Sequence, residues 1–131
     1  MTAHKGKVLL IDDDPVVISL YTALFRHSGY DVDTASDGEE GLTRLAQSRP
    51  DAVVLDLQMP KVNGLEWLLH ARADLGRATP PIVILTTSEI GVTMQAARHA
   101  GATEVLSKYR SNPDQVVDTV VALLGKTSPG G

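Results

Sequence analysis

The sequence predicts a doubly wound α/β domain, in which helices cover both faces of one five-stranded parallel sheet. Five short runs rich in valine, isoleucine and leucine recur along the chain, and segments with helical spacing of apolar residues separate them. The central runs are continuously apolar, which is typical of strands that are buried on both faces. A chain of 131 residues with 43% hydrophobic content suits one core and is too short for two ordinary domains.

The candidate strands are residues 8–11, 32–35, 52–55, 82–85 and 104–106. Between the first two, Asp14 and Pro15 place a cap and a first-turn proline at the start of a helix, and Gly29 ends it. The apolar stripe of this helix is Val17, Leu20, Tyr21 and Leu24.

The later helices begin at capping residues. Asp37, with Glu40 three residues later, resembles a capping box. Asn63 precedes the third helix, and Asn112 precedes the last. The fourth helix, around residues 92–100, has only a thin apolar face.

Two further features concern packing and the end of the domain. Trp67, within the third helix, is interpreted as a partly buried packing residue. The last helix has an apolar face wide enough to leave surface for a partner or a homodimer. We expect the domain to span residues 1–124, and residues 125–131 to form a disordered tail or the beginning of a linker.

Charge and composition exclude several classes of function. The net charge is −4 and the two signs are interspersed apart from one acidic run, so we expect no direct nucleic-acid binding. The absence of cysteine excludes disulfides, thiolate zinc sites and thiol nucleophiles. The apolar run at residues 8–11 is far shorter than a signal peptide or a membrane-spanning segment. We therefore expect a soluble, cytoplasmic protein without membrane contact.

Polar side chains accompany the ends of four of the five predicted strands. Asp12 and Asp13 follow the first strand, and Asp56 closes the third. Thr86 closes the fourth, and Lys108 lies just past the fifth. Any one aspartate here would be an ordinary turn residue. Because ligands of open parallel sheets bind beyond the carboxyl ends of the strands, the convergence of these side chains predicts a functional site.

Three carboxylates at one edge of a sheet require a cation. Two like charges about 4 Å apart repel by roughly 4 kcal/mol at an effective dielectric constant near 20. Oxygen ligands without histidine or cysteine favour magnesium, or manganese, over zinc. Together with the lysine and the threonine hydroxyl, this set suits phosphoryl transfer, and a carboxylate is the obvious nucleophile.

The segments VLLIDDDP, VVLDLQMPKVNGLE and IVILTT, with residues 101–108, resemble the receiver domains of bacterial two-component response regulators, including chemotaxis receivers. The resemblance extends to about residue 124. The acidic pair, the acceptor aspartate, the proline four residues later, the Asn-Gly turn, the hydroxyl residue and the lysine follow the family's order and spacing. The resemblance implies a flavodoxin-like sheet with strand order 2-1-3-4-5.

The resemblance also implies a role for each site residue. Asp56 would be the phosphoacceptor. Asp13 and Asp56, with the backbone carbonyl of Gln58, would coordinate Mg²⁺, and Asp12 would hold a metal-bound water. Thr86 would hydrogen-bond the phosphoryl group in the active state. Lys108 would neutralise the charge of the phosphoryl group.

The implied partners are a sensor histidine kinase or a phosphotransfer protein as the donor, and a downstream protein target. The chain would be a signalling phosphoacceptor that catalyses its own phosphorylation and dephosphorylation, and not an enzyme acting on other substrates.

The sequence departs from the family pattern at three positions. Tyr109 follows the lysine where the family usually has proline, so we predict a trans peptide bond between residues 108 and 109. Val105 replaces a common aromatic residue, which predicts that activation does not use an aromatic rotamer change there. Thr87 stands where the family tends to have a smaller residue. These departures put the usual route of signal transmission in doubt.

Three alternatives use related chemistry or the same fold. A haloacid-dehalogenase enzyme would want a second aspartate two residues after Asp56, where this chain has Gln58. A flavodoxin-like cofactor carrier would need a phosphate-binding loop after the first strand, and three aspartates there would repel phosphate. The third alternative is a pseudo-receiver, a docking module that works without phosphorylation, and the residues at positions 105 and 109 keep it open.

Overall fold

The computed structural model describes residues 5–57, 63–86, 91–108 and 111–127. Its sheet is built from five strands: β1 (Lys7–Ile11), β2 (Asp31–Ala35), β3 (Ala52–Asp56), β4 (Ile82–Thr86) and β5 (Glu104–Ser107). All neighbouring strands are parallel, and their order is β2-β1-β3-β4-β5. The predicted fold class and strand order are confirmed.

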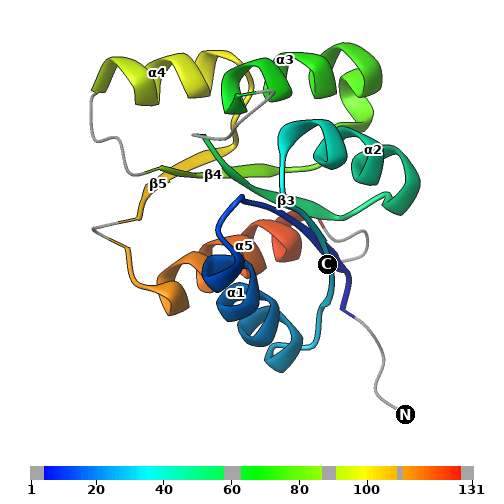
Figure 1. The fold of residues 1–131 in the computed structure, drawn as a ribbon, viewed down its shortest axis with the longest axis vertical. Helices are drawn as coiled ribbons and strands as arrows, with labels where there is room; N and C mark the ends of the chain where they lie inside the picture. The colour runs from blue at the N-terminus through cyan, green and yellow to red at the C-terminus, as the bar shows by residue number, and fades with distance from the viewer. Residues whose placement is uncertain (1–4, 58–62, 87–90, 109–110, 128–131) are drawn as a thin grey trace.

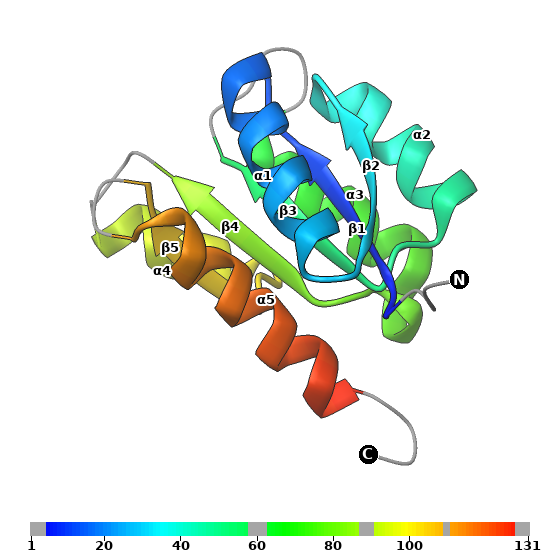
Figure 2. The same cartoon turned by 90° about the horizontal axis from the view of Figure 1, so that it is seen from below.

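Five α-helices connect the strands: α1 (Pro15–His27), α2 (Gly38–Ser48), α3 (Gly64–Leu75), α4 (Gly91–His99) and α5 (Pro113–Thr127). A short 3-10 helix, η1 (Gly76–Ala78), follows α3. Helices α1 and α5 cover one face of the sheet, and α2, α3 and α4 cover the other (Figures 1 and 2). No helix among the described residues is both long and apolar enough to cross a membrane.

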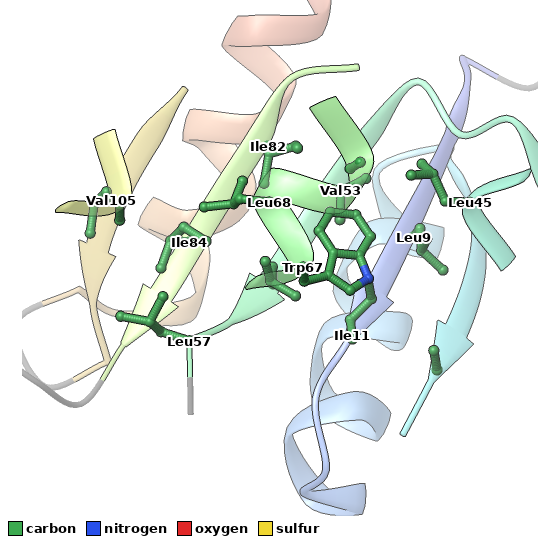
Figure 3. Close-up of a cluster of buried hydrophobic side chains, with 14 residues drawn as sticks. Leu9, Ile11, Leu45, Val53, Leu57, Trp67, Leu68, Ile82, Ile84 and Val105 are labelled. Atoms are coloured by element: carbon green, nitrogen blue, oxygen red, sulfur yellow. The ribbon is translucent and has the colours of Figure 1, made fainter. Parts of the chain in front are cut away.

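The sheet separates two apolar layers, because successive side chains of each buried strand point to opposite faces. Trp67 of α3 lies in the layer beneath α2 and α3, beside Ile11 and Val53 (Figure 3). Its side chain is fully buried, so the expectation of partial burial was wrong. The reason is a close approach of α2: a Cβ atom on Gly41 would lie only 2.9 Å from the indole Nε1.

The predicted capping residues act as expected. Asp14, Asp37, Asn63 and Asn112 each accept a hydrogen bond from a backbone amide two or three residues later, at 2.8 to 3.0 Å. Gly29 follows α1 with φ of 96°, a conformation that suits glycine. Within the predicted α1 stripe, however, Leu20 is exposed, because it lies at the edge of the buried face next to Val16.

Helix α5 continues through Gly125 to Thr127, past residue 124, where the domain was expected to end. A single glycine costs a helix only about 1 kcal/mol relative to alanine. The preceding turn is anchored because Leu123 and Leu124 pack against the core. Packing of that turn therefore outweighs the weak helix propensity of the glycine.

Arg49, at the C-terminal end of α2, is the single non-glycine residue with positive φ among the described residues, at φ 49° and ψ 60°. This left-handed conformation strains a residue that has a Cβ atom. We expect Arg49→Gly to increase the free energy of unfolding by about 0.5 to 1 kcal/mol in urea titrations. The control Arg44→Gly, at an exposed position inside α2, should decrease it by about 1 kcal/mol. Equal destabilisation by both substitutions would contradict the strain.

Candidate functional site

The parallel register brings the predicted site residues to the carboxyl edge of the sheet. Asp12 directly follows β1, and its backbone amide donates to the carbonyl of Ala35 at 3.1 Å. Asp56 is the last residue of β3. Lys108 directly follows β5, where its backbone amide donates to the carbonyl of Thr86 at 2.8 Å. Each functional side chain is therefore held by the end of a buried strand.

Three carboxylates converge at this edge. Asp12, Asp13 and Asp56 each offer one oxygen atom, and these atoms lie within 4.8 Å of one another. Asp12 and Asp56 are each only 5% exposed, whereas Asp13 is exposed. The amide of Asp14 donates to Oδ1 of Asp12 at 2.9 Å, which fixes the orientation of that carboxylate. Such a set of hard oxygen atoms fits a cation of the magnesium type.

The ammonium group of Lys108 supplies a fixed positive charge. Its Nζ atom lies 3.0 Å from Oδ2 of Asp12 and 3.4 Å from Oδ2 of Asp56. Burial tends to lower the pKa of Lys108, but the hydrogen bond to Asp12 and the charge of Asp56 outweigh burial and raise it. The lysine is therefore charged at neutral pH. Its one charge offsets only part of the charge of three carboxylates, and the remaining negative charge suits a cation.

Thr86 is fully buried at the end of β4, one position beyond Leu85, the residue that pairs with Asp56. Its neighbour in the register of β5 is Ser107, which is also buried. Ser107 was not singled out in the sequence, although a polar residue at the end of an apolar run was a signal for it. The two hydroxyl-bearing residues lie on the same face of the sheet.

A cavity of about 250 Å³ opens beside Asp12 and Asp13 and is also lined by Ser36 and Glu40. It lies between the start of α1 and the connection from β2 to α2. This cavity opens Asp12 and Asp13 to solvent. The oxygen Oε2 of Glu40 accepts a hydrogen bond from Ser36 at 3.4 Å, so the acidic character of the site extends toward α2.

Three features from the sequence analysis involve residues outside the described ones. They are the metal-ligand role of the Gln58 carbonyl, the effect of Thr87 at a position where the family tends to have a smaller residue, and the trans peptide bond before Tyr109. They stay predictions. Val105, in contrast, is described: it is buried in the layer beneath α3 and α4, together with Ile84 and Leu57 (Figure 3).

Besides Ser107, sequence reasoning missed Tyr21, which also lies close to the site. Tyr21 was assigned to the apolar stripe of α1, and its ring does pack in the core. It also lines a cavity of about 10 Å³ whose other walls include Asp12 and Asp56. Its spacing along the helix matched that of ordinary core residues, so periodicity alone could not single it out.

Comparison with known proteins agrees with this geometry. A family model for the response regulator receiver domain matches residues 8–121. The chain is 34% identical over 124 residues to the DNA-binding response regulator MtrA of Mycolicibacterium smegmatis, covering 95% of this chain and 53% of MtrA. It is 34% identical over 121 residues to the alkaline phosphatase synthesis transcriptional regulatory protein PhoP of Bacillus subtilis, covering 92% and 49% of the two chains. The chain thus spans about half the length of these relatives.

Solved structures show the same fold. The chemotaxis response regulator CheY4 of Vibrio cholerae has a TM-score of 0.82 and 30% identity, with 90% of this chain and 98% of that chain covered. The receiver domain of the Francisella response regulator 1452 has a TM-score of 0.87 and 26% identity, with 94% and 99% covered. The chain belongs to the response regulator receiver domain family.

Proposed function

We propose that the chain is a phosphorylation-activated switch, in which Asp56 accepts a phosphoryl group from a phosphohistidine of a sensor histidine kinase or phosphotransfer protein. The observation that carries this proposal is the meeting of three carboxylates and one ammonium group at the ends of three strands. The phosphorylated state then signals to a downstream protein target.

In the proposed step, a carboxylate oxygen of Asp56 attacks phosphorus while the bond from phosphorus to the imidazole nitrogen breaks. The nitrogen keeps the electron pair and takes a proton from solvent, and an acyl phosphate remains on the aspartate. Attack by water later releases inorganic phosphate and regenerates the carboxylate. The chain thus carries out its own phosphorylation and dephosphorylation, and acts on no other substrate.

Different site residues would stabilise the charge of the phosphoryl group in different ways. Asp12, Asp13 and Asp56, with the carbonyl of Gln58 as a further proposed ligand, would hold Mg²⁺, which when bound shields the charge on the phosphoryl oxygens. Lys108 neutralises part of the same charge, because its ammonium group already lies 3.4 Å from Asp56. Thr86 closes the adjacent strand, where its hydroxyl can turn to the phosphoryl group.

Partners are proposed on the same basis. MtrA is a DNA-binding response regulator and PhoP is a transcriptional regulatory protein, but this chain matches only about half of their length. The net charge of −4 disfavours direct contact with nucleic acid by the domain described here. We therefore propose that its output passes through protein contacts. A cytoplasmic location follows from the proposed donor.

The testing experiment is incubation with Mg²⁺ and a small phosphodonor, such as acetyl phosphate, followed by intact-mass measurement. We expect one phosphoryl group per chain, with labelling lost when a chelator removes the metal. The pseudo-receiver alternative, which Val105 favours by removing the aromatic switch, predicts no labelling under either condition. Labelling that persists undiminished in the chelator would overturn the role of the metal.

Thr86 and Lys108 should affect different steps. Lys108→Ala should slow labelling about tenfold, since it removes an ammonium group that pairs with the reacting carboxylate. Thr86→Ala should leave labelling nearly unchanged and weaken the conformational response, measured as NMR shift changes in β5 and α5 upon phosphorylation. Similar losses of labelling in both variants would contradict this division of roles.

A further inference from the structure

Strand β2 forms one edge of the sheet, because β1 is its single neighbour among the described strands. In a parallel pair, alternate residues of a strand bond to the neighbouring strand. The amide of Asp31 bonds to the residue before β1, and the carbonyl of Ala35 bonds to the residue after it, so the odd-numbered residues of β2 face β1. The amides and carbonyls of Val32 and Thr34 therefore point away from the sheet, where a further strand could bond to them.

A groove of about 580 Å³ runs along this edge, and residues 32–34 of β2 line it. Strand β2 lies between helices α1 and α2, which border the groove (Figure 2). The polar and basic side chains that the two helices contribute are Ser19, Thr22 and Arg26 of α1, and Arg44 of α2. A groove with a strand edge in its lining and helices beside it suits a single extended chain.

The charges in the groove favour an acidic occupant. Arg26 and Arg44 line it from different helices, and neither forms an ion pair with a carboxylate among the described residues. Asp33 is the acidic residue of the lining, and its carboxylate lies 3.9 Å from the ammonium group of Lys7. Although the whole chain has a net charge of −4, the groove presents more positive than negative charge.

A second copy of the chain would fit this edge poorly. If two complete β2 strands paired antiparallel, Asp31 would lie opposite Ala35, and Asp33 of one copy would lie opposite Asp33 of the other. Like charges directly opposite each other destabilise a pair of strands. The occupant is therefore expected to be a different chain.

We propose that the edge of β2 is a docking site for an extended acidic peptide of a partner protein, which adds to the sheet as a further strand. Its backbone would bond to the outward amides and carbonyls of Val32 and Thr34. Its alternate side chains would lie on the two faces of the sheet, where Arg26 and Arg44 pair with its carboxylates. Phosphorylation of Asp56 is not required, because no residue of the acidic cluster lines the groove.

The first test uses a short synthetic peptide of alternating glutamate and threonine with blocked ends, titrated into the full chain at low ionic strength. We expect saturable binding, with large NMR shift changes and slower hydrogen exchange at the amides of Val32 and Thr34. The same peptide with methylated backbone nitrogens cannot donate hydrogen bonds and should bind much more weakly. Equal binding of the two peptides, or no saturable binding of the first, would overturn the proposal.

The second test concerns charge. Arg26→Ala should weaken binding of the peptide about twofold to fivefold, the range expected for one exposed ion pair. The matched control is Arg77→Ala, which makes the same change of charge at an exposed position of η1 outside the groove. This control should bind the peptide like the unsubstituted chain. Equal weakening in both variants would show that the overall charge attracts the peptide, and would overturn the site.

A last comparison distinguishes a partner peptide from a second copy. In the chain alone, hydrogen exchange at Val32 and Thr34 should stay fast at every protein concentration. If these amides become protected as the concentration rises, and sedimentation shows a dimer, a second copy occupies the edge and the proposal is wrong.

Discussion

Asp56→Asn should reduce labelling by a small phosphodonor by at least about a thousandfold, the scale on which loss of a covalent nucleophile acts. An amide has the shape of the carboxylate, but it carries no negative charge and its oxygen is a poor nucleophile. Because asparagine has nearly the same shape and volume as aspartate, it fits the buried position at the end of β3 and the fold should stay intact. Intact mass and peptide mapping measure the loss.

The matched control is Asp118→Asn, an exposed position on α5 away from the acidic cluster. It should be labelled at the unsubstituted rate. If Asp56→Asn is labelled at a substantial fraction of that rate, the phosphoacceptor is another residue and the assignment of Asp56 is wrong.

The same variants test the cation without a donor. A ligand that binds only the folded state stabilises it, by about 2.7 kcal/mol at a concentration one hundred times its dissociation constant. Mg²⁺ should therefore raise the unfolding temperature of the unsubstituted chain and of Asp118→Asn. Asp56→Asn lacks one of the three clustered carboxylates and should respond much less.

The strand ends explain why so much of the site could be predicted. A buried parallel strand is visible as an apolar run, and a polar residue at its carboxyl end must face the ligand edge. This rule predicted that Asp12, Asp56 and Lys108 lie close together, and they do. The N-terminal caps were equally predictable, because a cap depends on local hydrogen bonds within three residues.

Features that depend on contacts between distant elements could not be predicted in the same way. Trp67 is fully buried because Gly41 lets α2 approach it, and these two residues belong to different helices. Tyr21 has the spacing of a core residue, and only the fold places it behind the carboxylates. The helical state of Gly125 depends on packing of the turn before it, which helix propensity does not describe.

Gly64→Ala should decrease the free energy of unfolding by about 2 to 3 kcal/mol, the range expected for a well-packed site forced to accept an additional group. A Cβ atom on Gly64 would lie 2.6 Å from the Cα atom of Leu57, a contact with backbone that no rotamer change can relieve. The amide of Gly64 also donates to the carbonyl of Leu57 at 3.0 Å, and any shift would lengthen that bond. Urea titration measures the decrease.

Gly125→Ala provides the matched control, because it makes the same chemical change in a helix where nothing lies within 4 Å of the new Cβ atom. It should increase the free energy of unfolding by about 0.5 to 1 kcal/mol through helix propensity alone. The two glycine substitutions are thus expected to have opposite signs. Since Leu57 directly follows Asp56, the displacement in Gly64→Ala should also slow labelling, whereas Gly125→Ala should not. A Gly64→Ala protein with unchanged stability would show that α3 can move away from β3 at little cost, and would contradict the tight contact beside the acceptor.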